Sequence, residues 1–323
     1  MDRRTFIVAG AGAIGGVSVA NAQQPGRVYR IGYLQGRSPL RDREDAFRQG
    51  LRDLGWIEGQ NVAIEYRYAD ANVETLRKMA AELVQLRVDV ILTSGTTAVR
   101  AARDATPTLP IVMASGEPVS TGLVASLARP GGNITGLTHV TNDLIGKRLE
   151  LLKEMVPNLV RAAAMLNPQN PGEGMFAGEM EATARALHLD LLIVRVSALE
   201  QIERALSSAV EQRVQALMVL EDPLFTSNAR RCTELAAHHR LPAVYGTAVY
   251  ARAGGLMSYG ANFVDLYRRA ASYVDKILRG AKPGELPIEQ PIKFELIVNL
   301  AAAKALGLAV PQALQVRADL VIQ

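Results

Sequence analysis

The chain has 323 residues, which suits two domains of ordinary size, and its 49% hydrophobic against 21% charged residues exclude wholesale disorder. The net charge is +4, with basic residues scattered singly rather than gathered in runs, so we expect no nucleic-acid partner. The single cysteine, Cys232, excludes an internal disulfide and a cysteine-based metal cluster.

Residues 1–22 have the pattern of a secretory leader. Arg3 and Arg4 give the start a twin-arginine character, and Phe6–Ala20 is an apolar run too short and glycine-rich for a membrane span. Ala20-Asn21-Ala22 supplies the A-x-A pattern for cleavage. We therefore predict a twin-arginine signal peptide cleaved after Ala22, a periplasmic location, and no lipid anchor, because no cysteine follows the cleavage point.

The same leader contains a G-x-G-x-x-G match, Gly10-Ala11-Gly12-Ala13-Ile14-Gly15. In a dinucleotide-binding fold these glycines would receive a pyrophosphate at a helix N-terminus. Ser18–Pro25 offers no long amphipathic helix, and Arg30 stands about where an acid should bind the ribose. We therefore assign the glycines to the leader and expect no cofactor.

From Val28 the sequence alternates strand and helix patterns. The expected strands are Val28–Leu34, Asn61–Tyr68, Val88–Thr93 and Pro110–Ala114, and the expected helices are Arg43–Leu54, Val73–Leu86 and Ala98–Asp104. This alternation predicts an α/β lobe with a parallel, doubly wound sheet and right-handed crossovers.

The tip of the third strand is rich in hydroxyl groups. Ser94-Gly95-Thr96-Thr97 follows a buried strand and opens a helix, so backbone N–H groups and the positive end of the helix dipole are available there. Such a tip suits a carboxylate or phosphate. An ordinary Ser/Thr helix cap is an equally good interpretation of the spacing.

The segment Ile111–Gly136 divides the chain in two. It begins as the end of a buried strand and finishes in Arg129–Gly136, where four helix breakers in eight positions rule out a helix interior. We predict that the chain here completes one α/β lobe and crosses to a second. A ligand would lie in the cleft between two such lobes.

The second half repeats the alternation and returns. The expected helices are Asn142–Met155, Met175–Leu187, Ile202–Glu211 and Asn228–Arg240, and the expected strands are Arg161–Leu166, Leu191–Val196, Ala216–Leu220 and Pro242–Tyr245. Gly254–Gly260 is interpreted as a second crossing, Phe263–Leu278 as a helix of the first lobe, Ile292–Val298 as a third crossing, and Leu300–Leu306 as a final helix. We predict lobe 1 at residues 28–138 plus 262–288 and lobe 2 at residues 139–261 plus 289–323, joined by a three-segment hinge.

With these motifs in order, the chain resembles one family. The residues that carry the likeness are GLVASLARPGGNITG, LPAVYG, GGLMSYG and LPIEQPIKFELIVNLAAAKALGLAVP. They are similar to the ABC-transporter substrate-binding proteins that include tryptophan-type periplasmic binding proteins. The resemblance covers residues 28–323 and implies the type I periplasmic-binding-protein fold, capture of a small solute and delivery to a membrane permease. One departure is Glu117 before Pro118, where many relatives have Asp.

Enzymatic chemistry finds little support in the sequence. No G-x-S-x-G elbow occurs, and none of the four histidines has a partner at metal-binding spacing, so we predict neither catalytic residues nor a metal. Cys232 falls in a helical run and is interpreted as a small buried hydrophobe. Glu221 and Asp222 are neighbours on an extended strand end and point to opposite faces, which favours one ligand contact over an acid–base pair.

A binding protein of this kind should contact its ligand at strand tips on both lobes. The candidates are Gln35, Ser38, Ser94, Gly95, Thr96, Thr97, Glu117, Asn167, Asn170, Glu221, Asp222, Tyr245 and Tyr259. We expect Thr96 and Thr97 to hold an α-carboxylate and Glu117 or Asp222 to pair with an α-ammonium. Tyr245 or Tyr259 would pack against an apolar or aromatic side chain, or else serve the hinge and core.

Two function classes remain open from the sequence. The first is a monomeric extracytoplasmic solute-binding protein that closes on an aromatic or branched-chain amino acid, or another small carboxylate, and delivers it to an ABC permease. The second is a ligand-sensing module of a membrane receptor with the same fold. A hydrolase or other enzyme is a remote alternative.

Overall fold

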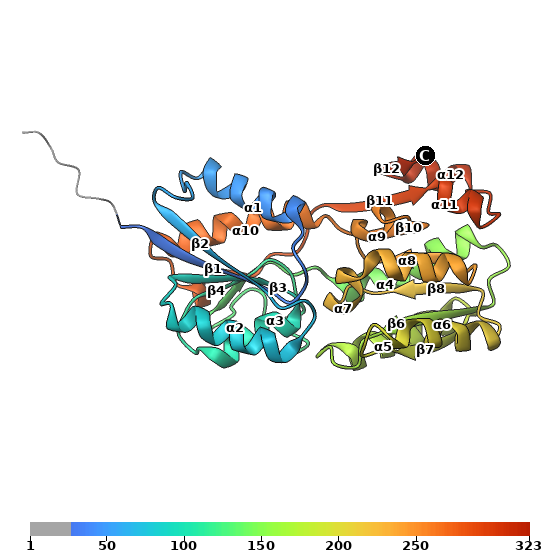
Figure 1. The fold of residues 1–323 in the computed structure, drawn as a ribbon, viewed down its shortest axis with the longest axis horizontal. Helices are drawn as coiled ribbons and strands as arrows, with labels where there is room; N and C mark the ends of the chain where they lie inside the picture. The colour runs from blue at the N-terminus through green and yellow to red at the C-terminus, as the bar shows by residue number, and fades with distance from the viewer. Residues whose placement is uncertain (1–26) are drawn as a thin grey trace, which may run out of the picture.

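The computed structural model describes residues 27–323, which form two α/β lobes lying side by side (Figure 1). The predicted leader, its cleavage site and the glycine motif lie outside the described residues. Within 27–323 no helix has the length and apolarity needed to traverse a bilayer.

Lobe 1 is built on a five-stranded parallel sheet in the order β2-β1-β3-β4-β5. Its strands are β1 (Tyr29–Gln35), β2 (Val62–Tyr68), β3 (Val90–Ser94), β4 (Ile111–Met113) and β5 (Ile134–Gly136). Its helices are α1 (Arg41–Asp53), α2 (Val73–Gln85), α3 (Thr96–Ala105) and α10 (Phe263–Leu278), with a short 3₁₀ turn η1 (Pro283–Glu285). Helices α1 and α10 cover one face and α2 and α3 the other, as in a doubly wound sheet (Figure 1).

Lobe 2 contains a seven-stranded sheet in the order β12-β11-β10-β9-β8-β6-β7. Its strands are β6 (Arg161–Leu166), β7 (Asp190–Arg195), β8 (Ala216–Val219), β9 (Ala243–Tyr245), β10 (Met257–Ala261), β11 (Phe294–Asn299) and β12 (Leu320–Ile322). Its helices are α4 (Thr141–Met155), α5 (Glu173–Ala186), α6 (Gln201–Glu211), α7 (Pro223–Ser227), α8 (Ala229–His238), α9 (Ala248–Arg252), α11 (Leu300–Ala305) and α12 (Gln312–Arg317).

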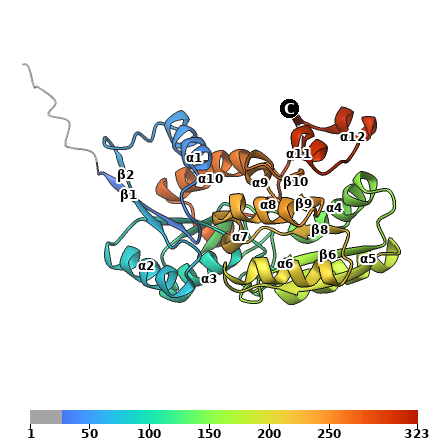
Figure 2. The ribbon, with the colours of Figure 1, turned by 45° about the vertical axis from the view of Figure 1, so that its right-hand side comes forward.

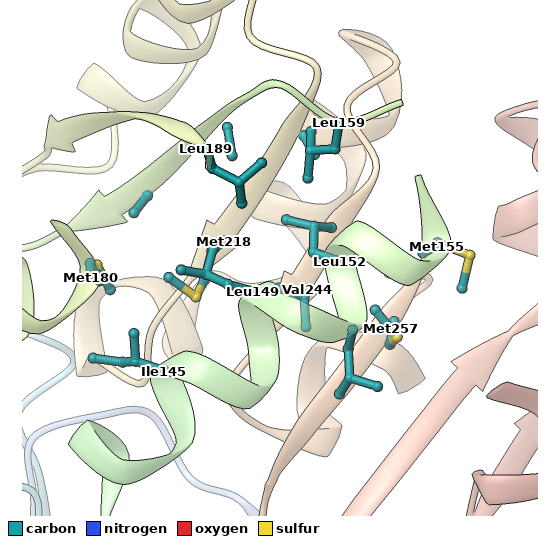
Figure 3. Close-up of a cluster of buried hydrophobic side chains, with 14 of the residues drawn as sticks. Ile145, Leu149, Leu152, Met155, Leu159, Met180, Leu189, Met218, Val244 and Met257 are labelled. Carbon is teal, nitrogen blue, oxygen red and sulfur yellow. The ribbon is translucent and has the colours of Figure 1, made fainter. Parts of the chain in front are cut away.

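The core of lobe 2 shows why α4 forms where the sequence predicts it. Ile145, Leu149 and Leu152 recur at helical spacing, are fully buried, and face the strands that carry Met218 and Val244 (Figure 3). Burial of such a stripe is the main favourable term for a helix of this length.

Three segments join the lobes, as predicted, and they lie side by side. The first runs from β5 to α4, the second from β10 to α10, and the third leads into β11. Thr138 N donates to Glu289 O (2.9 Å), and Asn262 N donates to Lys293 O (3.0 Å). Hydrogen bonds therefore tie the first and second crossings to the third.

The predicted fold class is confirmed, with differences in detail. Strand β5, helices α7, α9 and α12 and strand β12 were not predicted, since each has six residues or fewer and gives no periodic signal. Strand β11 pairs antiparallel with β10, whereas the sequence predicted parallel sheets. A chain that re-enters lobe 2 along the hinge runs against the strand by which it left.

Candidate functional site

A cleft lies between the lobes and is lined by residues of both, as is common for small-ligand sites at domain interfaces. Lobe 1 and the crossing segments contribute Arg37, Arg43, Ser94, Gly95, Thr96, Thr97, Ser115, His139 and Phe263. Lobe 2 contributes Asn170, Phe176, Glu221, Asp222, Pro223, Thr226 and Thr247. Seven of the thirteen candidates from the sequence lie in this lining, namely Ser94, Gly95, Thr96, Thr97, Asn170, Glu221 and Asp222.

The wall of lobe 1 is the N-terminus of α3. Gly95 adopts φ +90°, a conformation that favours glycine, and turns the chain from β3 into the helix. The N–H groups of Thr96 and Thr97 are the first two of the helix, so they have no intrahelical acceptor. Ser94 and Ser115 share a hydroxyl hydrogen bond of 2.7 Å beneath them. This wall can accept an anion.

Asp222 forms the opposite wall in lobe 2. Its carboxylate accepts hydrogen bonds from the amide groups of Asn167 and Asn170 (both 2.9 Å) and caps α7 through Leu224 N (3.0 Å). Burial raises the pKa of Asp222, and these three hydrogen bonds act in the opposite direction. The asparagines thus hold the Asp222 side chain in place at the cleft.

Glu221 lines the cleft but is already paired. Both carboxylate oxygens bind the guanidinium of Arg148, at 3.0 Å to one oxygen, and Arg148 also donates to Tyr259 O (2.8 Å). Arg148 is fully buried, and its remaining contact is Gly246 O at 3.4 Å. This bidentate pair links α4 to the tips of β8, β9 and β10.

Glu117 lies beside the cleft rather than in its lining. Its Oε1 accepts a hydrogen bond from Thr141 N (2.8 Å), so it caps α4 across the first crossing segment. Its own N–H donates to Thr96 Oγ1 (3.1 Å). Burial raises the pKa of Glu117, while His139 and the Thr141 amide act to lower it.

The two candidate tyrosines do not line the cleft. Tyr245 is 1% exposed and stacks on Tyr250 of α9 at 4.6 Å between ring centroids, within the core of lobe 2. Tyr259 packs against the other core cluster of that lobe. The aromatic lining comes instead from Phe176 of α5 and Phe263 of α10.

The remaining candidates surround the cleft. Gln35 is buried and accepts a hydrogen bond from Tyr267 Oη (2.7 Å). Ser38 N donates to Ser227 Oγ (3.0 Å), a contact between the lobes, and its hydroxyl binds Asp70. Asn167 lines a smaller pocket that shares Thr97, Asp222 and Pro223 with the main cleft.

Two arginines of the lining, Arg37 and Arg43, were not predicted from the sequence. Arg37 lies just beyond the tip of β1, and Arg43 lies on α1. Arg43 stands one helical turn before Phe47, on the face of α1 that is otherwise apolar, and this misplaced charge was the signal available in the sequence.

The part of the chain that the structure describes includes neither a metal-binding cluster nor an exposed thiol. Across residues 27–323, no three His, Cys, Asp or Glu side chains gather in a way that could hold a metal ion. Cys232 is 1% exposed, and burial raises the pKa of its thiol to about 12, so it stays protonated at neutral pH. His139 lines the cleft, although nothing about its position in the sequence indicated this.

The sequence and the fold of this chain are both similar to those of known proteins. A family model described as ABC transporter substrate binding protein matches residues 36–322. A tyrosine-binding protein of Clostridioides difficile is 27% identical over 263 residues, which is 81% of this chain and 75% of that protein.

Solved structures share the fold over nearly the whole chain. A conserved domain protein of Vibrio cholerae is 26% identical with a TM-score of 0.85, covering 91% of this chain and all of the other. An ABC domain from Streptococcus pneumonia in complex with L-Trp is 24% identical with the same TM-score and coverage. Both the matched family and the shared fold are those of solute-binding proteins rather than enzymes. The two-lobed chain, with its cleft of strand tips and helix ends, belongs to the family of ABC transporter substrate-binding proteins.

Proposed function

We propose that the protein captures a small carboxylate-bearing solute, an amino acid, in the cleft between its lobes and delivers it to an ABC permease. One observation carries the proposal. The free amides of α3 and the carboxylate of Asp222 face the same cleft from opposite walls. An α-amino acid presents the complementary pair of charges.

The proposed contacts follow from the lining. Thr96 and Thr97 bind the carboxylate of the solute through their amides, as at other helix N-termini. Asp222 binds the ammonium group, because Glu221 is already paired with the cationic Arg148 and Glu117 does not line the cleft. Phe176 and Phe263 pack against the side chain of the solute. The names of the relatives, a tyrosine-binding protein and an L-Trp complex, support an amino acid.

We further propose that binding closes the hinge, with residues 28–138 plus 262–288 and residues 139–261 plus 289–323 moving as units. Contacts between the lobes at the mouth support this. Ser38 N reaches Ser227 Oγ at 3.0 Å, and Arg252 reaches Asp42 at 3.5 Å. Such contacts hold a closed clamp around a ligand and break when it opens.

The predicted leader at residues 1–22 is consistent with export to the periplasm, where members of this family typically act. We expect the mature protein to act there as a monomer. A permease encoded beside it would favour transport over a sensing role.

The α3 amides can be tested by one pair of variants. Thr96 is the first helical residue, where proline is tolerated, so Thr96→Pro removes the amide hydrogen. Thr96→Val keeps the amide and loses the same hydroxyl. We expect Thr96→Pro to weaken amino-acid binding about 10- to 100-fold relative to Thr96→Val, the range for a hydrogen bond to a charged group.

Isothermal titration calorimetry on protein freed of bound solute measures this ratio, and thermal shift over the amino acids and small organic acids identifies the ligand. A ligand at about a hundred times its Kd adds about 2.7 kcal/mol of stability. Equal affinity of the two Thr96 variants would contradict the role of α3. Failure of the whole panel to bind would contradict the proposed class of solute.

A further inference from the structure

Two buried guanidinium groups line the cleft without an acid of their own. Arg37 is 6% exposed and Arg43 is 3% exposed. Among the described residues neither has a carboxylate within ion-pair distance, and the acid next to Arg43 in the chain, Asp42, pairs with Arg252 (3.5 Å). A buried charge without a partner is expensive, so this arrangement requires a reason.

The contacts of the two arginines leave them free for a further partner. Arg37 donates to Tyr267 Oη (2.5 Å), while its Nε is buried without an acceptor. The guanidinium of Arg43 lies over the ring of Phe263 at 4.1 Å from the centroid. Such stacking occupies the face of the guanidinium and leaves the N–H groups at its edge free to donate. Within residues 27–323 those edge groups have no hydrogen-bond acceptor.

Arg148 of the same chain is a buried arginine whose guanidinium nitrogens all have hydrogen-bond partners. Arg148 is buried more deeply than Arg43, yet Glu221 and two backbone carbonyl oxygens saturate its guanidinium. The protein therefore pairs a buried arginine where its role is structural. Arg43 differs in facing the cleft, where a solute can supply the missing anion.

The charges of the lining do not balance. Arg148 neutralises Glu221, so the remaining charged side chains are Arg37, Arg43 and Asp222. Two positive charges and one negative charge leave an excess of one positive charge, and the α3 N-terminus adds to it. A neutral amino acid in its zwitterionic form has no net charge and would leave this excess uncompensated.

We propose that the solute carries a net negative charge, with a second acidic group beyond its α-carboxylate, and that Arg43 binds this second group. The proposal rests on the proposed function and narrows its substrate class to acidic amino acids and dicarboxylates. Arg37 contributes through its free Nε.

Two further atoms of the lining support an acidic group at this position. His139 Nδ1 and Thr247 Oγ1 are buried without partners, and both residues line the cleft with Arg43. His139 also packs near the ring of Phe263, on which Arg43 stacks (6.2 Å between centroids). Each can donate a hydrogen bond to a carboxylate oxygen. Burial and the neighbouring Arg37 lower the pKa of Arg43 to about 10, which still leaves it charged at neutral pH.

The test compares solutes that differ only in the second acid. Calorimetry on solute-free protein would use L-glutamate against L-glutamine, L-aspartate against L-asparagine, and 4-carboxy-L-phenylalanine against L-phenylalanine. We expect the acid of at least one pair to bind about tenfold or more tightly than its neutral partner, because a buried site built for a charged group rejects a ligand that lacks it.

The assignment to Arg43 needs a matched pair of variants. Arg43→Gln should abolish the preference for the acid while leaving the melting temperature of the solute-free protein unchanged or raised, since an unpaired buried charge is removed. Arg41→Gln removes the same charge two residues away on the exposed face of α1 and should keep the preference. A lowered melting temperature with an intact preference would assign Arg43 a structural role and overturn the proposal.

The outcomes separate the two proposals. Tighter binding of the neutral member in every pair would overturn the acidic class and leave amino-acid capture standing. Binding of dicarboxylates such as succinate, without need of an amine, would support Arg43 and remove the role of Asp222. If no member of any pair and no dicarboxylate binds, the acidic class is overturned, and amino-acid capture is then decided by the thermal-shift panel of all the amino acids.

Discussion

At the scale of single residues, Glu117 joins the two lobes through a backbone amide. Its N–H donates to Thr96 Oγ1 at the start of α3, and its carboxylate accepts the hydrogen bond from Thr141 N at the start of α4. Burial is the largest influence on its ionisation and raises its pKa above the ordinary value. Folding therefore favours the protonated form of this side chain.

This gives a pH dependence of defined sign. A raised folded-state pKa stabilises the fold below the ordinary pKa of glutamate, about 4.3, and the stabilisation is lost as pH rises through the folded-state pKa. Glu117→Gln keeps an acceptor for Thr141 N without the charge. We expect the variant to match the wild type in unfolding free energy near pH 4 and to exceed it at pH 7 to 8, as measured by urea denaturation across that range.

Glu150→Gln provides the control, since Glu150 lies exposed on α4 and pairs only with Lys147 across the surface. Its substitution should change the unfolding free energy little at any pH. A Glu117→Gln variant with a lower unfolding free energy than the wild type at pH 7 to 8 would contradict this prediction. It would mean that the hydrogen bond from the Thr141 amide stabilises the charged carboxylate more than burial destabilises it.

At the scale of elements, the tight packing of α1 on α10 closes one face of the lobe 1 sheet. The two helices lie side by side in both views (Figures 1 and 2). A Cβ atom at Gly50 would lie 2.6 Å from Arg268 O and 2.8 Å from Ala271 Cβ. The absence of a side chain at Gly50 thus sets the distance between the helices, and these same helices carry Arg43 and Phe263.

Gly50→Ala is therefore expected to destabilise the protein by about 1–3 kcal/mol, the range for overpacking, although alanine is the better helix former. Gly178→Ala is the matched control. Gly178 also lies inside a helix, α5, but a Cβ there meets nothing within 4 Å, so we expect a gain of about 0.5–1 kcal/mol. Urea denaturation measures both, and a stabilising Gly50→Ala would show that α1 shifts without cost.

The elements also show how far the sequence could predict the site. Ser94, Gly95, Thr96 and Thr97 were found because the carboxyl ends of parallel strands meet at one edge of a sheet. Tyr245 was placed in the cleft by the same rule, but α9, which was not predicted, supplies Tyr250 and draws the ring into the core. The fate of a strand-tip side chain depends on the next element as much as on the strand.

Pairings between residues far apart in the chain could not be predicted from the sequence. Glu117 caps α4, which begins 24 residues later, and Glu221 pairs with Arg148 of the same helix, 73 residues earlier in the chain. A single sequence shows that these side chains are charged, but not which partner each one finds. The lack of an acidic partner for Arg43 could not be predicted either, because it depends on the positions of all the side chains around it.

At the scale of the whole molecule, closure should leave a local signature at the mouth of the cleft. The amide of Ser38 reaches Ser227 of the opposite lobe, so it is protected only while the lobes are together. We expect a bound solute to slow hydrogen exchange in the peptide containing Ser38 and to reduce the radius of gyration in X-ray scattering. The peptides of α6, away from the cleft, serve as the internal reference. Exchange at Ser38 that is indifferent to a bound solute would indicate a rigid cleft.

The burial of Cys232 has a practical consequence. A thiol that is enclosed in a core and protonated at neutral pH does not compete for maleimide dyes in the native protein. Cysteines introduced at exposed Glu74 on α2 and Arg204 on α6 would therefore take up a donor and an acceptor fluorophore without removal of the native thiol. Energy transfer between the two lobes would then turn the protein into an optical sensor that reports the concentration of its own solute.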